Sequence, residues 1–186
     1  MASSGKNTSG NLYSTSIASS TALAADSNGV LVAATAPYTP SVFSARVNTP
    51  VTNVTGDGTN YTVIFNTAAI NTGSNYDTAT GIYTAPATGS YSFQYGIFFT
   101  SIGGAHTGLT LYIQGTSTWG GNPILNPAPI ALAGSGNISL NGSITLALTS
   151  GNTVSIGALI SGGAKTVGVY GDATTAYSYF SGFRVS

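Results

Sequence analysis

The sequence predicts an all-β fold, a sandwich or barrel built from short antiparallel strands. Apolar and polar residues alternate with a period of two in several stretches, and no stretch holds a 3.6-residue apolar period. Turn sequences rich in Gly separate these stretches, and Gly makes up 25 of the 186 residues. Short strands joined by such turns are typical of antiparallel sandwiches and barrels.

The alternating stretches are expected to form the strands. In chain order they are 62–65, 91–99, 109–113, 138–148, 153–160, 166–170 and 176–185. Turn sequences separate most of them, at 56–58, 85–89, 150–152 and 161–163. The longest stretch without alternation is 115–129, and we expect it to be a loop.

Residues 1–40 differ in composition from the rest of the chain. Ser, Thr and Ala dominate there, and one weak hairpin is indicated around Asn28-Gly29. Two prolines in 36–40 favour an extended linker. We therefore expect 1–40 to be a neck or stalk and 41–186 to be a jelly-roll head. Because the first segment has little apolar mass, a disordered tail is the alternative.

Charged residues are unusually scarce in this sequence. Four Lys or Arg and four Asp are the only formal charges, and the net charge is zero. Ordinary domains are about a quarter charged. We therefore expect no nucleic-acid partner and no binding to anionic lipid. No apolar run is long enough for membrane insertion, and weak charge repulsion favours association between copies.

Aromatic, Asn and Gly residues follow a spaced pattern between residues 65 and 95. The pattern consists of Phe65, Asn71, Tyr76, Tyr83, Gly89, Tyr91, Phe93 and Tyr95. It resembles the signature of the globular head domain of complement component one, subcomponent q, a family that shares its jelly roll with tumour necrosis factor. The family usually has Phe where Tyr83 stands, a change that keeps the aromatic ring.

Flanking segments support this resemblance. Residues 42–48 (VFSARVN) resemble the first strand of the family, and 179–185 (YFSGFRV) resemble its last strand. Residues 148–158 resemble the turn before a long strand, with Asn152 in place of the usual Asp. The resemblance covers 42–185. It implies a fold of about ten strands in a jelly-roll sandwich that assembles as a three-fold homotrimer.

Two sets of aromatic residues are candidates for the core or for the trimer interface. Residues two apart in a strand share a face. The sets are Tyr91, Phe93, Tyr95 and Phe99 in one strand, and Tyr177, Tyr179 and Phe183 in another. The resemblance implies that strands bearing aromatics line the trimer axis. We therefore expect part of these aromatic faces to contact the same faces of the other two subunits there. An ordinary monomer core filled by the same residues is the alternative.

The residues that catalysis needs are almost missing, so no catalytic residue is expected and the protein is predicted not to be an enzyme. The chain has one His, no Cys and no Glu. His106 is expected to be an exposed loop residue, and Asp57, Asp77 and Asp172 are expected to form turns. No metal site or other cofactor is expected, although calcium held by one Asp from each subunit stays open.

Loops with aromatic side chains are the candidate ligand sites. Trp119 lies in 115–129, where its ring could stack on a sugar while the amides of Asn122 and Asn126 bond hydroxyl groups. Tyr170 and Asp172, in a turn before the last strand, form a second candidate. The alternative for Trp119 is that it covers an interface or the edge of the core.

Together these features predict a non-enzymatic, homotrimeric head at the tip of a fibre. It would recognise glycan or protein ligands on another cell through three weak sites that act together. The fibre would belong to a bacterial cell surface or to a phage tail, and the chain would be the C-terminal part of a longer one. The alternative is a structural trimerisation cap without a ligand. A third hypothesis is a hydrolase that acts on surface polysaccharide, which would need clustered carboxylates.

Overall fold

The computed structural model describes residues 4–6, 12–14, 23–25, 31–33, 40–117, 119–133 and 136–186, with the backbone alone before residue 40, at 122–125 and at 130–131. The chain divides into two compact units, Met1–Thr39 and Pro40–Ser186. In the first unit the strands form two antiparallel pairs, β1 (Ser4–Lys6) with β2 (Leu12–Ser14) and β3 (Leu23–Ala25) with β4 (Leu31–Ala33). The second pair agrees with the hairpin expected around Asn28-Gly29, whose turn lies outside the described residues.

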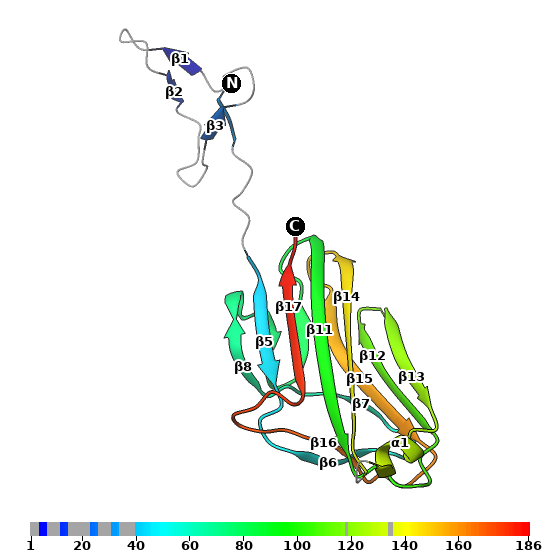
Figure 1. The fold of residues 1–186 in the computed structure, drawn as a ribbon. Helices are drawn as coiled ribbons and strands as arrows, with labels where there is room; N and C mark the ends of the chain where they lie inside the picture. The colour runs from blue at the N-terminus through cyan, green and yellow to red at the C-terminus, as the bar shows by residue number, and fades with distance from the viewer. Residues whose placement is uncertain are drawn as a thin grey trace. The chain divides into compact units, whose positions relative to one another are not determined.

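The second unit is a sandwich of two antiparallel sheets (Figure 1). The β11 sheet has the order β6-β16-β11-β17-β5-β8, and β14 also pairs with β11. Its strands are β5 (Val42–Arg46), β6 (Val51–Thr55), β8 (Thr67–Asn71), β11 (Gly89–Thr100), β14 (Ile138–Leu148), β16 (Val167–Val169) and β17 (Tyr179–Arg184). The predicted all-β jelly roll is therefore confirmed.

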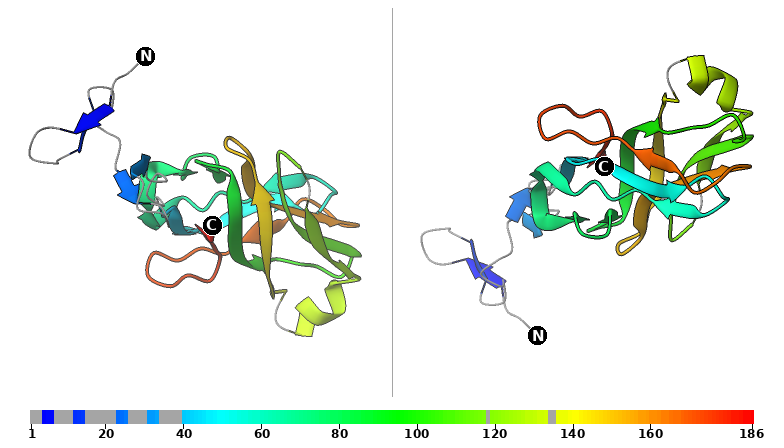
Figure 2. Two further views of the ribbon diagram at one scale, coloured as in Figure 1. Left: turned by 90° about the horizontal axis from the view of Figure 1, so that it is seen from above. Right: turned by 90° about the horizontal axis from the view of Figure 1, so that it is seen from below.

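The β15 sheet forms the other layer, in the order β13-β12-β15-β10-β9, and β7 also pairs with β15. Its strands are β7 (Asn60–Thr62), β9 (Tyr76–Asp77), β10 (Ile82–Thr84), β12 (Gly108–Gly115), β13 (Gly120–Leu125) and β15 (Thr153–Ser161). Two short helices complete the unit, η1 (Thr72–Ser74) and α1 (Ala128–Ala133), and α1 lies outside the two layers (Figure 2).

Aromatic side chains fill the space between the two sheets. Phe43 is at the centre, with ring centroids 4.9 Å from Tyr76, 4.9 Å from Tyr83 and 4.8 Å from Phe180. The four ring residues of β11 are all buried there as well: Tyr91, Phe93, Tyr95 and Phe99. Each fully buried large side chain contributes roughly 1.5–3 kcal/mol to folding. The spaced aromatic pattern of the sequence is thus the core of one subunit.

Three expectations about elements are wrong. The strand predicted at 176–185 begins only at Tyr179, so Tyr177 lies in the connection before it. The strand predicted at 62–65 ends at Thr62, and the buried Val63 and Phe65 belong to the connection that follows. The segment 115–129 is not one loop, because it contains β13 and the start of α1. β13 shows no alternation because it is an edge strand, where backbone pairing with β12 suffices and Pro123 is tolerated.

Candidate ligand-binding site

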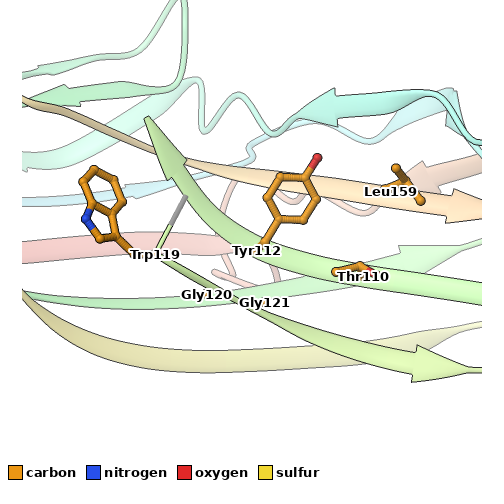
Figure 3. A pocket seen from close by; sticks show the side chains of 6 residues that line it. All are labelled: Thr110, Tyr112, Trp119, Gly120, Gly121 and Leu159. Atoms are coloured by element: carbon orange, nitrogen blue, oxygen red, sulfur yellow. The ribbon is translucent and has the colours of Figure 1, made fainter. Parts of the chain in front are cut away.

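An open hollow on the outer face of the β15 sheet is the candidate site (Figure 3). Its volume is about 520 Å³, and its lining residues are Thr110, Tyr112, Trp119, Gly120, Gly121 and Leu159. None of these residues is charged. In the view of Figure 3 the Tyr112 ring stands between the side chains of Trp119 and Leu159.

Strand register explains why Tyr112 lines this hollow. The alternation of β12 buries Leu111 and Ile113 in the core, so Tyr112 between them faces outward. Its cross-strand partners are both glycines, Gly121 on β13 and Gly157 on β15. The tyrosine therefore stands between two positions that have no side chain.

The two glycines have different consequences for the Tyr112 ring. A Cβ at Gly157 would lie only 2.8 Å from Cζ of Tyr112, so the ring covers the backbone of β15. On the other side, a Cβ at Gly121 would lie 3.1 Å from Cβ of Tyr112 and 3.3 Å from Cγ2 of Thr110. A side chain at 121 would thus occupy the hollow, and its absence leaves the hollow open. Burial raises the pKa of the Tyr112 hydroxyl, which therefore stays protonated at neutral pH.

Trp119 combines the two alternatives that the sequence left open. It is half-buried and packs against the hydrophobic core, and it also lines the hollow. Its backbone N–H donates to the carbonyl oxygen of Ile113 at 3.1 Å, which ties this residue to the end of β12. Part of the indole is therefore fixed by the core while another part faces the hollow.

Of the two asparagines predicted to assist Trp119, Asn126 is not among the residues that line the hollow. Asn122 pairs with Leu111 in the β12–β13 register, and its side chain lies outside what the structure describes. Asn126 is exposed after β13 and has a φ of 57°, a left-handed conformation that Asn tolerates better than most residues. Its backbone N–H donates to the carbonyl oxygen of Thr107.

Tyr170 and Asp172 belong to a different surface, the connection between β16 and β17 of the β11 sheet. The Tyr170 ring packs at 5.6 Å from Phe98 and at 5.2 Å from Tyr177. Asp172 Oδ1 accepts hydrogen bonds from the hydroxyl and backbone N–H of Thr174 and from the N–H of Thr175, and these bonds lower the pKa of its carboxyl. Asp172 is therefore a turn former, as expected.

The other two turn aspartates are also confirmed. Asp57 accepts the N–H of Thr59 at 3.0 Å, and Asp77 accepts the N–H of Ala79 at 2.8 Å. These bonds lower the pKa of both carboxyls. Within the described part of the chain, no three His, Cys, Asp or Glu side chains come together as a metal site would need.

His106 is buried, so its expected exposure is wrong. Only 3 % of its surface is accessible. Its Nδ1 accepts the N–H of Gly103 at 2.8 Å, and its Nε2 donates to the carbonyl oxygen of Ala164 at 3.1 Å. Gly163 leaves the space for the ring, because a Cβ there would lie 2.6 Å from Nε2. The imidazole thus joins two loops and lies in neither of the surfaces described here.

Of the aromatic residues in 177–185, Phe180 is in the core and the predicted Tyr177, Tyr179 and Phe183 lie on the outer face of the β11 sheet. Tyr177 and Phe183 are each 46 % exposed, and Tyr179 is half-buried over Gly96. Cross-strand neighbours on this face are small and uncharged over most of its width. One row across β5, β17, β11 and β14 consists of Ser44, Ser181, Gln94 and Ser143. A second row consists of Val42, Phe183, Ser92 and Thr145.

Sequence reasoning missed Thr110, Tyr112, Gly121 and Leu159 as site residues. The stretch 109–113 was expected to be a strand, and its alternation places Thr110 and Tyr112 on the same outer face. The sequence did not reveal the strand order, which brings Gly121 and Leu159 beside Thr110 and Tyr112. These residues were missed because pairing between strands far apart in the chain leaves no local pattern.

Comparison with known proteins agrees with this architecture. The model for the C1q domain family matches residues 42–185. The globular domain of zebrafish complement 1qA protein matches with a TM-score of 0.52 and 20% identity, covering 80% of this chain and 98% of that one. Eiger TNF from S. frugiperda matches with a TM-score of 0.55 and 14% identity, covering 79% of this chain and 93% of that one.

Murine APRIL is a further structural match, with a TM-score of 0.51 and 11% identity over 79% of this chain and 100% of that chain. No curated protein matches the chain. Among the described residues, no helix is long and apolar enough to cross a membrane. The family model spans 42–185 of the 186 residues and the jelly-roll fold agrees with it, so the chain belongs to the C1q domain family.

Proposed function

We propose that the head is a non-enzymatic homotrimer that recognises glycan or protein ligands on the surface of another cell. The observation that carries the recognition function is the hollow beside Trp119 and Tyr112, which combines two aromatic rings with an uncharged lining. Aromatic rings with a polar edge are common in binding surfaces, because one part is apolar and the other can form hydrogen bonds.

The outer face of the β11 sheet supports the trimer. It has exposed aromatic side chains at Tyr177 and Phe183 beside rows of serine, threonine and glutamine. A hollow of about 230 Å³ lies among Val42, Ser44 and Phe183 and could receive a side chain of a second copy. Because this face has few charges, little charge would have to lose its water in a contact between copies.

The outer edge of β14, away from β11, supports the trimer independently. This strand has 11 residues, none of them charged and none Pro, and within the described residues it pairs only with β11. Its inward-facing Leu140 and Ile144 are only half-buried. Natural proteins usually protect an edge of this length with charges, prolines or a covering element. Packing of the β14 edge on the β11 sheet of a neighbour is head-to-tail, and such contacts close into a ring of three when each copy is rotated by one third of a turn.

Three copies of the hollow in one trimer would make weak single sites effective. Binding of the second and third sites becomes intramolecular, which raises the overall affinity without new contacts. This arrangement suits a fibre tip on a bacterial surface or a phage tail, with residues 1–40 as the neck. A structural cap without a ligand is the second candidate, and the part of Trp119 that packs against the core favours it.

The proposal is tested with the full chain by light scattering and by binding to a glycan array and to intact bacterial cells. We expect the mass of a trimer and a set of bound glycans or cells. Ser181→Glu places a charge in the middle of the proposed interface and should give monomers with lost avidity, while Thr84→Glu on the β15 sheet should leave the trimer intact.

Two results would contradict this proposal. A wild-type chain that stays monomeric at micromolar concentration would remove the trimer. A trimer that binds neither glycans nor cells would remove recognition and leave the structural cap.

A further inference from the structure

Resting on the recognition function proposed above, we infer that the hollow takes a neutral pyranose ring, which stacks by its C–H face on Trp119 and Tyr112. Gly121 is the residue that keeps this site open. The ligand class follows from three properties of the hollow: its shape, its lack of charge and its free polar groups.

The shape depends on the missing side chain at 121. The hollow has a volume of about 520 Å³, within the range of about 300–1,000 Å³ for small-molecule sites. A Cβ at Gly121 would already lie at 3.1 Å from Tyr112 and 3.3 Å from Thr110, so any larger side chain would fill the space between them. A flat ring can enter between Trp119 and Tyr112 only because residue 121 is glycine.

The absence of charge favours a neutral ligand. Among the described residues that line the hollow there is no Lys, Arg, Asp, Glu or His. A carboxylate of a uronic or sialic acid would lose water there without meeting a cation, which is costly. A quaternary ammonium group could stack on the indole of Trp119, but no carboxylate lines the hollow to hold it. A neutral sugar has neither difficulty.

Polar groups around the hollow match the hydroxyls of a sugar. They are the Thr110 hydroxyl, the Tyr112 hydroxyl and Nε1 of Trp119, and within the described part of the chain no hydrogen bond uses them. Both hydroxyls can donate or accept, and the indole can donate. β13 adds backbone groups, because in the described sheet it pairs only with β12. A pyranose offers an apolar face to the rings and hydroxyls to these groups.

The chain itself supplies the probe, because Trp119 is its only tryptophan. Tryptophan fluorescence of the full chain is titrated with methyl β-galactopyranoside and methyl α-glucopyranoside as neutral sugars, and with N-acetylneuraminic acid, glucuronic acid and tetramethylammonium as charged probes. We expect at least one neutral sugar to give a saturable change. We expect the charged probes to bind about tenfold more weakly or worse, a difference of about 1.4 kcal/mol.

A matched pair of valine variants tests the role of residue 121. Gly121→Val should weaken the neutral sugar at least about tenfold, again about 1.4 kcal/mol. Thr84→Val puts a valine on β10 of the same sheet, away from the hollow, and should leave the titration unchanged. Circular dichroism and the trimer mass check folding. If Gly121→Val does not fold, Gly121→Ala adds a single methyl and should weaken binding in the same direction.

The outcomes separate this inference from the recognition function. A folded Gly121 variant with wild-type sugar binding would overturn the assigned site, and equal or tighter binding of a charged probe would overturn the ligand class. In both cases the recognition function would still stand if the trimer binds glycans on the array or binds intact bacterial cells. A trimer that binds nothing on the array and none of the sugars would overturn both.

Discussion

The ring of Phe93 occupies the space that a side chain at Gly182 would need. The two residues pair across β11 and β17, and a Cβ at Gly182 would lie 2.5 Å from Cδ1 of Phe93. On the other side it would lie 2.8 Å from Cε1 of Phe43. The Phe-Ser-Gly-Phe sequence of the last strand therefore has glycine at 182 because two core rings meet over it.

Gly182→Ala should destabilise the head by about 1–3 kcal/mol, because an added methyl in a filled core forces its neighbours to move. Chemical denaturation followed by circular dichroism measures the free energy of unfolding. Ser181→Ala, one residue earlier on the opposite face, is the control and should change it by less than about 0.5 kcal/mol. Equal effects of the two changes on the free energy of unfolding would contradict the claim that the two rings over Gly182 leave no room for a side chain.

His106→Ala should cost about 1–3 kcal/mol, because it empties the buried space that the imidazole fills and removes its hydrogen bonds to Gly103 and Ala164. The same denaturation experiment measures the loss. The exposed neighbour Lys165→Ala is the control and should be close to neutral. A neutral His106→Ala would mean that the two loops hold together without the imidazole.

Stability should fall when the turn aspartates become protonated. Hydrogen bonds lower the folded-state pKa of Asp57, Asp77 and Asp172 below the unfolded value, which is about 3.9. Their contribution is therefore fully present above that value and is lost as the pH falls through the lower, folded pKa values. In a variant with all three changed to Asn, the melting temperature should fall less steeply as the pH is lowered below about 4. If the melting temperature of that variant falls with pH as it does in the wild type, groups other than these three aspartates cause the loss of stability in acid.

The proposed trimer should keep its mass between low and high salt, because so few charges are available to hold it together. Light scattering at about 0.05 M and 1 M sodium chloride checks this. Dissociation at high salt would indicate that ion pairs, and not uncharged contacts on the outer face of the β11 sheet, hold the copies.

Trp119→Ala should leave the trimer intact and weaken glycan binding on the array. The indole lines the hollow on the β15 sheet, away from the proposed interface. Tyr61→Ala is a matched control, since Tyr61 is another half-buried aromatic that packs against the core without lining the hollow. An array signal unaffected by the loss of Trp119 would remove this residue from the site.

Local patterns of the sequence were enough for an antiparallel sandwich or barrel, and the family resemblance added the jelly roll, but neither was enough for the site. The alternation of 138–148 gives β14 residue for residue, because a strand with one buried face leaves a clear period of two. β13 and the burial of His106 left no such signal, since both depend on partners far along the chain. The same is true of the hollow, which forms where Trp119, Tyr112 and Leu159 meet through strand pairing.

The long outer edge of β14 also bears on how the chain is produced. Under the proposed assembly, a folded copy that has not yet met its partners presents a strand of 11 residues that has no charge or proline and, among the described residues, pairs only with β11. Stacking of such strands between molecules is the first step of cross-β aggregation. Slow expression at low concentration would reduce encounters between such edges. Early association of three chains would shorten the time that the edge stays uncovered.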